Sequence, residues 1–222
     1  MPFTVQLEHR DFFEKNKFIE LEELFSVEQV DVLNRHLDQA LSNRTKTRKE
    51  ARTQTQTQTQ FVDGYDMWRE DAQIKKITQK HNIAEVVAEI FRTTPLRIAF
   101  DLFLAAGHTS PFSKELPLTE SSCLQPLTGA LLLQLSDSTG EVSGFPLPSK
   151  KGNVLIISPQ FPIPWPTLFA TPGIRLFMMG FGGQKTLYRA EIKDPHAPFL
   201  KKLGYVYGDF LKDSSHPLLV RK

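Results

Sequence analysis

The side chain best suited to chemistry in this sequence is one arginine in a stretch without histidine. Residues 152–181 read GNVLIISPQFPIPWPTLFATPGIRLFMMGF, in which two short apolar runs are typical of buried strands and Arg175 opens the second run. A guanidinium fork matches a carboxylate in bidentate geometry, so Arg175 could anchor an organic acid. Between the runs lie Pro, Trp, Thr and Phe, where a metal-binding barrel of this layout would need an imidazole.

The sequence lacks the residue spacing of a zinc site, a phosphate loop or a serine nucleophile, and its cysteine lacks a neighbouring histidine. Cys123 is the single cysteine and has no histidine near it in sequence, so we interpret it as a buried structural thiol in a reducing compartment. One cysteine and scattered histidines do not suit a zinc site. The run GFGGQKT at 180–186 has the wrong glycine spacing for a phosphate loop and predicts a turn between strands. No serine lies in a Gly-x-Ser-x-Gly elbow.

Composition indicates a globular protein without a strongly charged partner. The chain has 222 residues, of which 40% are hydrophobic and seventeen are Phe, so we expect one domain with an aromatic core or pocket. Its 27 basic and 25 acidic residues argue against nucleic acid or an anionic membrane as the main partner. The basic cluster at 44–52 is interpreted as a solvated loop rather than a phosphate-binding patch. No apolar run is long enough to span a membrane and residues 1–7 have no signal-peptide core, so we expect a cytoplasmic protein.

Helical patterns come first and strand patterns follow. We expect a largely helical segment at 9–41, with a cap at Ser26, then a mobile loop at 42–60 and further helix up to Pro95, with a break near 81–82. The expected strands are 96–104, 127–135, 144–148, 154–158, 174–180 and 187–192. This order predicts one α+β domain, a double-stranded β-helix of the jelly-roll, cupin-like kind with an N-terminal helical layer. Its parts are the helical layer 1–95, the β-helix core 96–192 and a C-terminal extension 193–222.

The order of these segments resembles the phytanoyl-CoA dioxygenase branch of the iron and 2-oxoglutarate dependent oxygenases. The quoted segments are FFEKNKFIELEELFSVEQV at 12–30, TTPLRIAFDL at 93–102, LLLQLSDSTGE at 131–141, LPSKKGNVL at 147–155 and GIRL at 173–176. The resemblance implies that Arg175 receives the distal carboxylate of 2-oxoglutarate.

The sequence departs from that family at its metal ligands. The family chemistry depends on His-x-Asp/Glu plus a distal His, a facial triad that leaves open positions on Fe(II). The resemblance implies the first two ligands near 118–123 and the distal one near 162–165, yet no histidine occurs in either segment. His108 is followed by Ser110 where a carboxylate is required, and His196 and His216 come after the barrel strands. His108 and Glu120, with a C-terminal histidine, are only weak metal candidates.

We therefore expect a non-catalytic relative without a metal or cofactor. It would bind a small carboxylic acid in a pocket with Arg175 as the anion-binding group, or bind a protein partner. The expected lining of that pocket is Thr119, Glu120, Trp165 and Met178. Two alternatives stay open: an active Fe(II) and 2-oxoglutarate dependent hydroxylase with atypical ligands, and a purely structural or interaction module.

Overall fold

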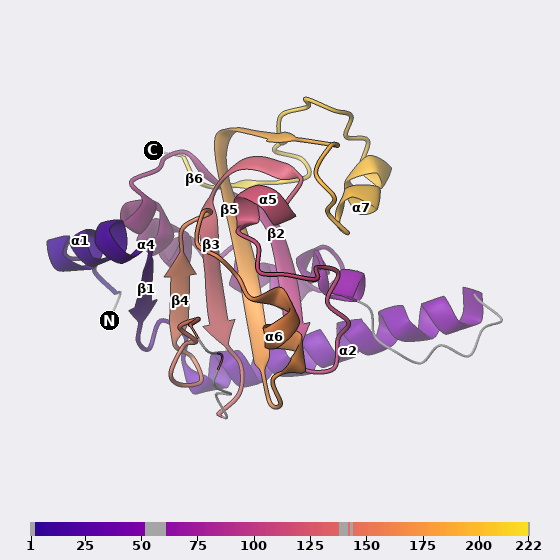
Figure 1. Cartoon of the computed structure of the whole chain (residues 1–222), viewed down its shortest axis with the longest axis horizontal. Helices are drawn as coiled ribbons and strands as arrows, with labels where there is room; N and C mark the ends of the chain where they lie inside the picture. The colour runs from indigo at the N-terminus through magenta and orange to yellow at the C-terminus, as the bar shows by residue number, and fades with distance from the viewer. Residues whose placement is uncertain (1–2, 52–60, 138–141, 143, 222) are drawn as a thin grey trace.

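A computed structural model describes residues 3–51, 61–137, 142 and 144–221, and its centre is one curled antiparallel sheet (Figure 1). The six strands lie in the order β1-β4-β3-β5-β2-β6, and every neighbouring pair is antiparallel. Their bounds are β1 (Phe18–Leu21), β2 (Leu96–Ala105), β3 (Leu124–Gln134), β4 (Val154–Ile157), β5 (Arg175–Tyr188) and β6 (Leu218–Val220). The expected mixture of helices and an antiparallel β core is confirmed.

Helices precede, connect and follow the strands. The α-helices are α1 (Leu7–Asn16), α2 (Val27–Ala51), α3 (Ala72–Thr78), α4 (His81–Phe91), α5 (Leu118–Ser121), α6 (Trp165–Ala170) and α7 (Ala197–Lys202), and two 3-10 turns are η1 (Phe61–Gly64) and η2 (Met67–Arg69). The expected interruption of the second helical segment is present between α3 and α4. None of the helices in the described ranges is long and apolar enough to cross a membrane.

The sheet separates two hydrophobic cores. On β5, Phe177 and Met179 pack with the N-terminal helices, while Leu176 and Met178 pack on the opposite, inner side. This alternation follows from the two-residue period of a strand. In Figure 1, α5 and α6 lie in front of the sheet and α2 passes behind it. We call the side of Met178 the inner face and the side of Met179 the helix face.

Helix α2 begins as expected and ends later than expected. Ser26 and Gln29 form a capping box, in which the Gln29 amide donates to Ser26 Oγ (3.3 Å) and the Ser26 amide donates to Gln29 Oε1 (3.1 Å). The expected loop from residue 42 is wrong up to Ala51, because the helix continues through Arg44. The Arg44 guanidinium donates to the carbonyls of Asp63 (2.7 Å) and Tyr65 and pairs with Glu70 (2.9 Å). The expected Thr-Gln loop at 52–60 lies outside the described residues.

Four strand assignments also differ from expectation. β1 lies inside the stretch 9–41 that was expected to be largely helical, where it pairs with β4 at one end of the sheet. β6 brings part of the C-terminal extension back to pair with β2. Residues 144–148 do not form a strand, whereas β5 runs on to Tyr188 because its far end pairs with the start of β3.

Leu37 tests the packing of α2 on the helix face. Its side chain is fully buried, together with those of Val30 and Leu33. We expect Leu37→Ala to lower the free energy of unfolding by about 2–5 kcal/mol in urea denaturation, because it removes buried methyl groups and leaves a cavity. Arg35→Ala, one exposed position on the same helix, should change it by less than about 0.5 kcal/mol. Equal effects of the two substitutions would contradict this packing.

Candidate functional site

Segments 116–119 and 159–165, which overlap the ranges 118–123 and 162–165 where the resemblance implies metal ligands, meet on the inner side of the sheet. Leu116 and Ile163 form an isolated antiparallel bridge, with amide-to-carbonyl distances of 3.1 and 3.2 Å. The Thr119 amide donates to the Pro159 carbonyl (3.1 Å), and Trp165 Nε1 donates to the Leu116 carbonyl (3.1 Å). Backbone pairing therefore brings segments 116–119 and 159–165 together, although 39 residues lie between them.

The buried side chains at this meeting point are apolar. Leu118, Ile163 and Trp165 are at most 2% exposed and belong to the inner core. The rings that pack edge to face on Phe61 in that core are Tyr65, Phe112, Trp165 and Phe169. These rings explain part of the high Phe content and occupy the space next to the two segments.

The predicted pocket residues do not gather in one place. Trp165 and Met178 are both buried in the inner core, Thr119 is half-buried, and Glu120 is exposed on α5. Arg175 lies on the helix face, where its guanidinium donates to Asp38 Oδ1 (2.9 Å). Residues three apart in an extended strand point to opposite faces, so Arg175 and Met178 do not line the same pocket.

Contacts with α2 and β2 hold Arg175 on the helix face. The guanidinium donates to Asn34 Oδ1 from Nε (3.3 Å) and Nη2 (3.1 Å), and it lies 5.0 Å from the centroid of the Phe103 ring. The carboxylate that Arg175 was expected to bind on a ligand is thus supplied by Asp38 of the same chain.

Two of the histidines weighed as metal ligands, His108 and His216, are also far apart. His108 follows β2 and stacks on Phe169, whereas the carbonyl of His216 accepts from Arg97 at the other end of β2. Eight residues of extended strand between Arg97 and Ala105 span about 26 Å. Within the described ranges, no group of three or more His, Cys, Asp and Glu residues is placed to hold a metal ion.

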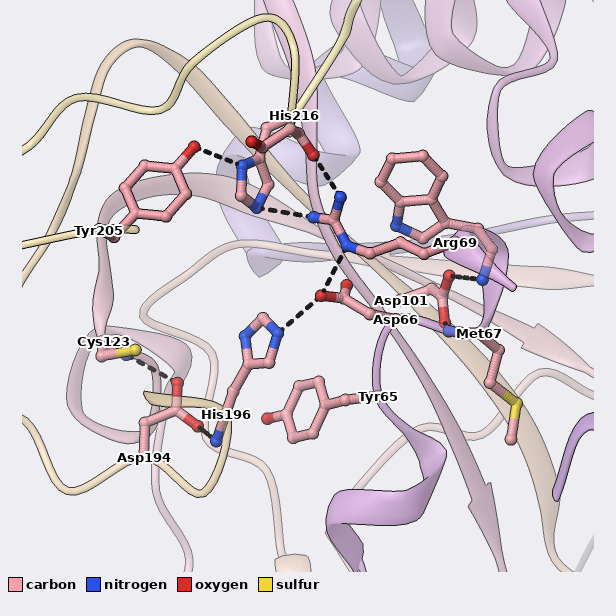
Figure 2. A network of polar contacts seen from close by, with 12 residues as sticks. Tyr65, Asp66, Met67, Arg69, Asp101, Cys123, Asp194, His196, Tyr205 and His216 are labelled. Carbon is pink, nitrogen blue, oxygen red and sulfur yellow. Dashed lines mark hydrogen bonds and ion pairs between the residues drawn. The ribbon is translucent and has the colours of Figure 1, made fainter. Parts of the chain in front are cut away.

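A buried polar network, which the sequence analysis missed, joins η2 to the C-terminal segment (Figure 2). Asp66 is its centre: Oδ2 accepts from His196 Nε2 (2.8 Å) and from Arg69 Nε (3.1 Å). Arg69 also contacts His216 Nε2 (3.1 Å), and His216 Nδ1 lies 2.8 Å from the Tyr205 hydroxyl. We call Asp66, Arg69, His196, Tyr205 and His216 the Asp66 network.

Two further carboxylates fix the backbone around this network. Asp101, fully buried on β2, accepts from the amides of Met67 (2.9 Å) and Trp68 (3.0 Å), which positions the turn that follows Asp66. Asp194 accepts from the amides of Cys123 (2.8 Å) and His196 (2.8 Å). The C-terminal segment is thereby attached to the start of β3 as well as to η2 (Figure 2).

Hydrogen bonding defines the charge of each histidine in the network. An arginine can only donate, so the contact with Arg69 requires an unprotonated acceptor at His216 Nε2, and the imidazole is neutral. Burial and the Arg69 charge correspondingly lower the pKa of His216 to about 3. Burial opposes a charge on His196 too, but the Asp66 carboxylate outweighs it and raises the pKa of His196.

The pKa values of Asp66 and of its neighbour Asp101 are shifted in opposite directions. Burial would raise the pKa of Asp66, but His196 and Arg69 outweigh it and hold this pKa well below its ordinary value. Burial and the nearby Asp66 charge raise the pKa of Asp101 to about 7, against the two amides that it accepts from. Burial likewise raises the pKa of the Cys123 thiol far above its ordinary value, which leaves it unreactive.

The Asp66 network is suited to holding the chain and not to catalysis. Asp66 is 1% exposed, and His196 and His216 are fully buried, so none of the three presents a polar atom to a substrate. The sequence signal that could have found it is the run YDMWR at 65–69, where an acid and a base lie among aromatic residues. Its partners, 130 or more residues away from Asp66, carry no such signal.

Asp66→Asn tests whether the network holds the fold together. It leaves the Arg69 guanidinium and the Nε2 donor of His196 without their buried anion, so we expect a loss of about 3–5 kcal/mol in the free energy of unfolding. Urea denaturation followed by circular dichroism measures this change. Asp11→Asn, an exposed position on α1, is the control, with a change of less than about 0.5 kcal/mol. A neutral result for Asp66→Asn would contradict the role assigned to this carboxylate.

The low pKa of His216 predicts a specific pH dependence. Between pH 6.5, the ordinary pKa of histidine, and about pH 3, His216 is protonated in the unfolded chain and neutral in the folded chain. The free energy of unfolding therefore falls as the pH is lowered through this range. The stability difference between wild type and His216→Gln should therefore fall by about 2 kcal/mol from pH 7 to pH 5. Urea denaturation of both proteins at the two pH values gives this difference. If it stays constant, His216 is not neutral in the folded protein.

Solved structures share this fold at low sequence identity. The chain is similar to SnoK, a non-heme α-ketoglutarate dependent carbocyclase from nogalamycin biosynthesis, with TM-score 0.69 and 13% identity over 98% of this chain and 99% of that one. HygX from Streptomyces hygroscopicus, solved with nickel and 2-oxoglutarate bound, has a TM-score of 0.56 and 13% identity over 94% of this chain and 98% of that one. CT296 from Chlamydia trachomatis has a TM-score of 0.51 and 18% identity over 82% of this chain and 99% of that one.

Sequence comparisons add no closer relative: no protein-family model matches the chain, and no curated protein shows significant similarity to it. The structural likeness nevertheless confirms the predicted fold class. The chain has the mixed helix and strand fold, with a curled jelly-roll sheet, of the non-heme iron and 2-oxoglutarate dependent oxygenases.

Proposed function

We propose that this protein is a non-catalytic member of the oxygenase fold, related to the phytanoyl-CoA dioxygenase branch, and that it acts by binding. The observation that carries the proposal is the apolar meeting point of segments 116–119 and 159–165. Their backbones pair, yet Leu118, Ile163 and Trp165 direct apolar side chains into a filled core.

The residues at this point do not fit an iron ion. Fe(II) in this fold requires imidazole and carboxylate ligands with open positions for cosubstrate and oxygen. Neither segment carries an ionisable side chain, and the carboxylate of Glu120, the residue that follows the first segment, is exposed. Iron would supply the oxidant that an oxygenase needs, and the side chains of the inner core cannot replace that chemistry. The ligand of such a binding protein is a small acid or a partner protein.

Arg175 weakens the argument for 2-oxoglutarate as the ligand. Its guanidinium is 32% exposed and already paired with Asp38, and it lies across the sheet from the inner core. A cosubstrate carboxylate would have to displace this pair and would still be on the face opposite Trp165.

Metal and cosubstrate binding test the proposal directly. The protein is loaded with Fe(II) under anaerobic conditions, desalted and analysed for metal, then assayed for succinate release from 2-oxoglutarate beside an active oxygenase. We expect substoichiometric iron, no succinate above background and the same thermal shift with 2-oxoglutarate for wild type and Arg175→Ala. Stoichiometric iron together with succinate release would contradict a non-catalytic protein.

A further inference from the structure

A cleft on the helix face has the features of a ligand site and does not involve the inner core. It measures about 350 Å³ and lies between α1, α4, Thr128 on β3 and the residues that follow β4. Its lining includes three basic side chains, Arg10, Lys17 and Arg92, together with the hydroxyls of Thr128 and Ser158. We call it the α1–α4 cleft.

Two donors that line this cleft have no partner. Ser158 is 5% exposed and its Oγ has no hydrogen-bond partner, and the same holds for the buried Nε of Arg10. A buried donor without an acceptor destabilises a folded protein, so such groups generally have a partner. Both atoms are covered by protein in the free chain, so an oxyanion in the cleft would satisfy them once the two side chains turn toward it.

The charge of the cleft favours an anion. Arg10 pairs with Glu89 at 3.3 Å. Arg92 lies 3.9 Å from Glu14, and both of these side chains are largely exposed. Counting these two carboxylates against Arg10, Lys17 and Arg92 gives 3 − 2 = +1. The cleft thus keeps an excess positive charge.

The helix ends at the cleft do not reverse this charge. Helices α1 and α4 both end there, and the carbonyls of a helix C-terminus repel anions. Three of these carbonyls already accept within the chain: Phe13 from the Lys17 amide (2.8 Å), Ala88 from the Thr93 amide (3.0 Å) and Phe91 from Thr93 Oγ1 (3.1 Å). The cationic side chains therefore set the preference.

One wall of the cleft is aromatic. Phe13 and Phe91 pack edge to face with ring centroids 5.3 Å apart, and Ile90 and Pro159 complete this wall. A planar apolar group would bury surface against these side chains while its charged end meets the basic ones. A second cleft of about 430 Å³ shares Phe91 and Thr128 with the first and extends to Lys185, which leaves room for a longer ligand.

We propose that the α1–α4 cleft binds a small organic oxyanion, an aromatic ring bearing a carboxylate or phosphate group, with Arg10 and Ser158 as donors to the oxyanion. The basic side chains attract the anion, and Phe13 and Phe91 contact the ring. This site lies on the helix face, so it holds or fails independently of whether the inner core binds iron.

Calorimetric titration with phenyl phosphate and benzoate tests the site and separates the two oxyanions. Benzyl alcohol carries the ring without the charge, and inorganic phosphate carries the charge without the ring. We expect at least one of the two aryl anions to bind measurably tighter than both controls, and its affinity to fall as salt is raised. No binding of either aryl anion, or equal binding of benzyl alcohol, would overturn the proposal.

Three variants locate the binding. Arg10→Gln should weaken the bound aryl anion by about tenfold or more, because a charged hydrogen bond is lost. Ser158→Ala should weaken it while leaving the melting temperature unchanged or higher, because its hydroxyl has no partner in the free protein. Lys15→Gln removes an exposed charge of α1 outside the cleft and should change affinity less than twofold. Unchanged affinity in Ser158→Ala, or an equal loss in Lys15→Gln, would assign the binding elsewhere.

Discussion

The buried charge of Asp66 is the interaction on which much of the structure depends. A carboxylate that is 1% exposed is tolerated only when cations and donors surround it, and here these come from segments distant in the sequence. His196 brings in the C-terminal segment, Arg69 comes from η2, and Asp101 fixes the backbone between Asp66 and Arg69. The Asp66 network therefore joins the helical layer, the sheet and the C-terminal extension.

Because side chains alternate along β5, the inner core at Met178 and the helix face at Arg175 are on opposite sides of the sheet. Its inner face carries Met178 into a core filled by aromatic rings, and its helix face carries Arg175 to Asp38. The fold is like that of the non-heme oxygenases compared above, and the buried side chains where segments 116–119 and 159–165 meet are apolar. The open, positively charged space lies instead in the α1–α4 cleft, where Ser158 and Arg10 have donors without partners.

Local patterns predicted the elements, and distant contacts decided the rest. The capping box at Ser26, the apolar runs of β2, β3 and β4 and the mixed fold class all follow from short-range periodicity. The extension of α2 depends on Arg44 reaching η1, and the role of His196 depends on Asp66, 130 residues away. Arg175 could have been placed better, because its spacing of three from Met178 already puts the two on opposite faces of a strand.

We expect the inner core to hold no iron site. Crystals grown with Mn(II), a substitute for Fe(II), and 2-oxoglutarate would test this through anomalous diffraction at the manganese edge. No anomalous peak should lie between Leu118, Ile163 and Trp165, and the aromatic side chains should pack as described. A strong peak there, with 2-oxoglutarate bound beside it, would show that the inner core does bind the metal.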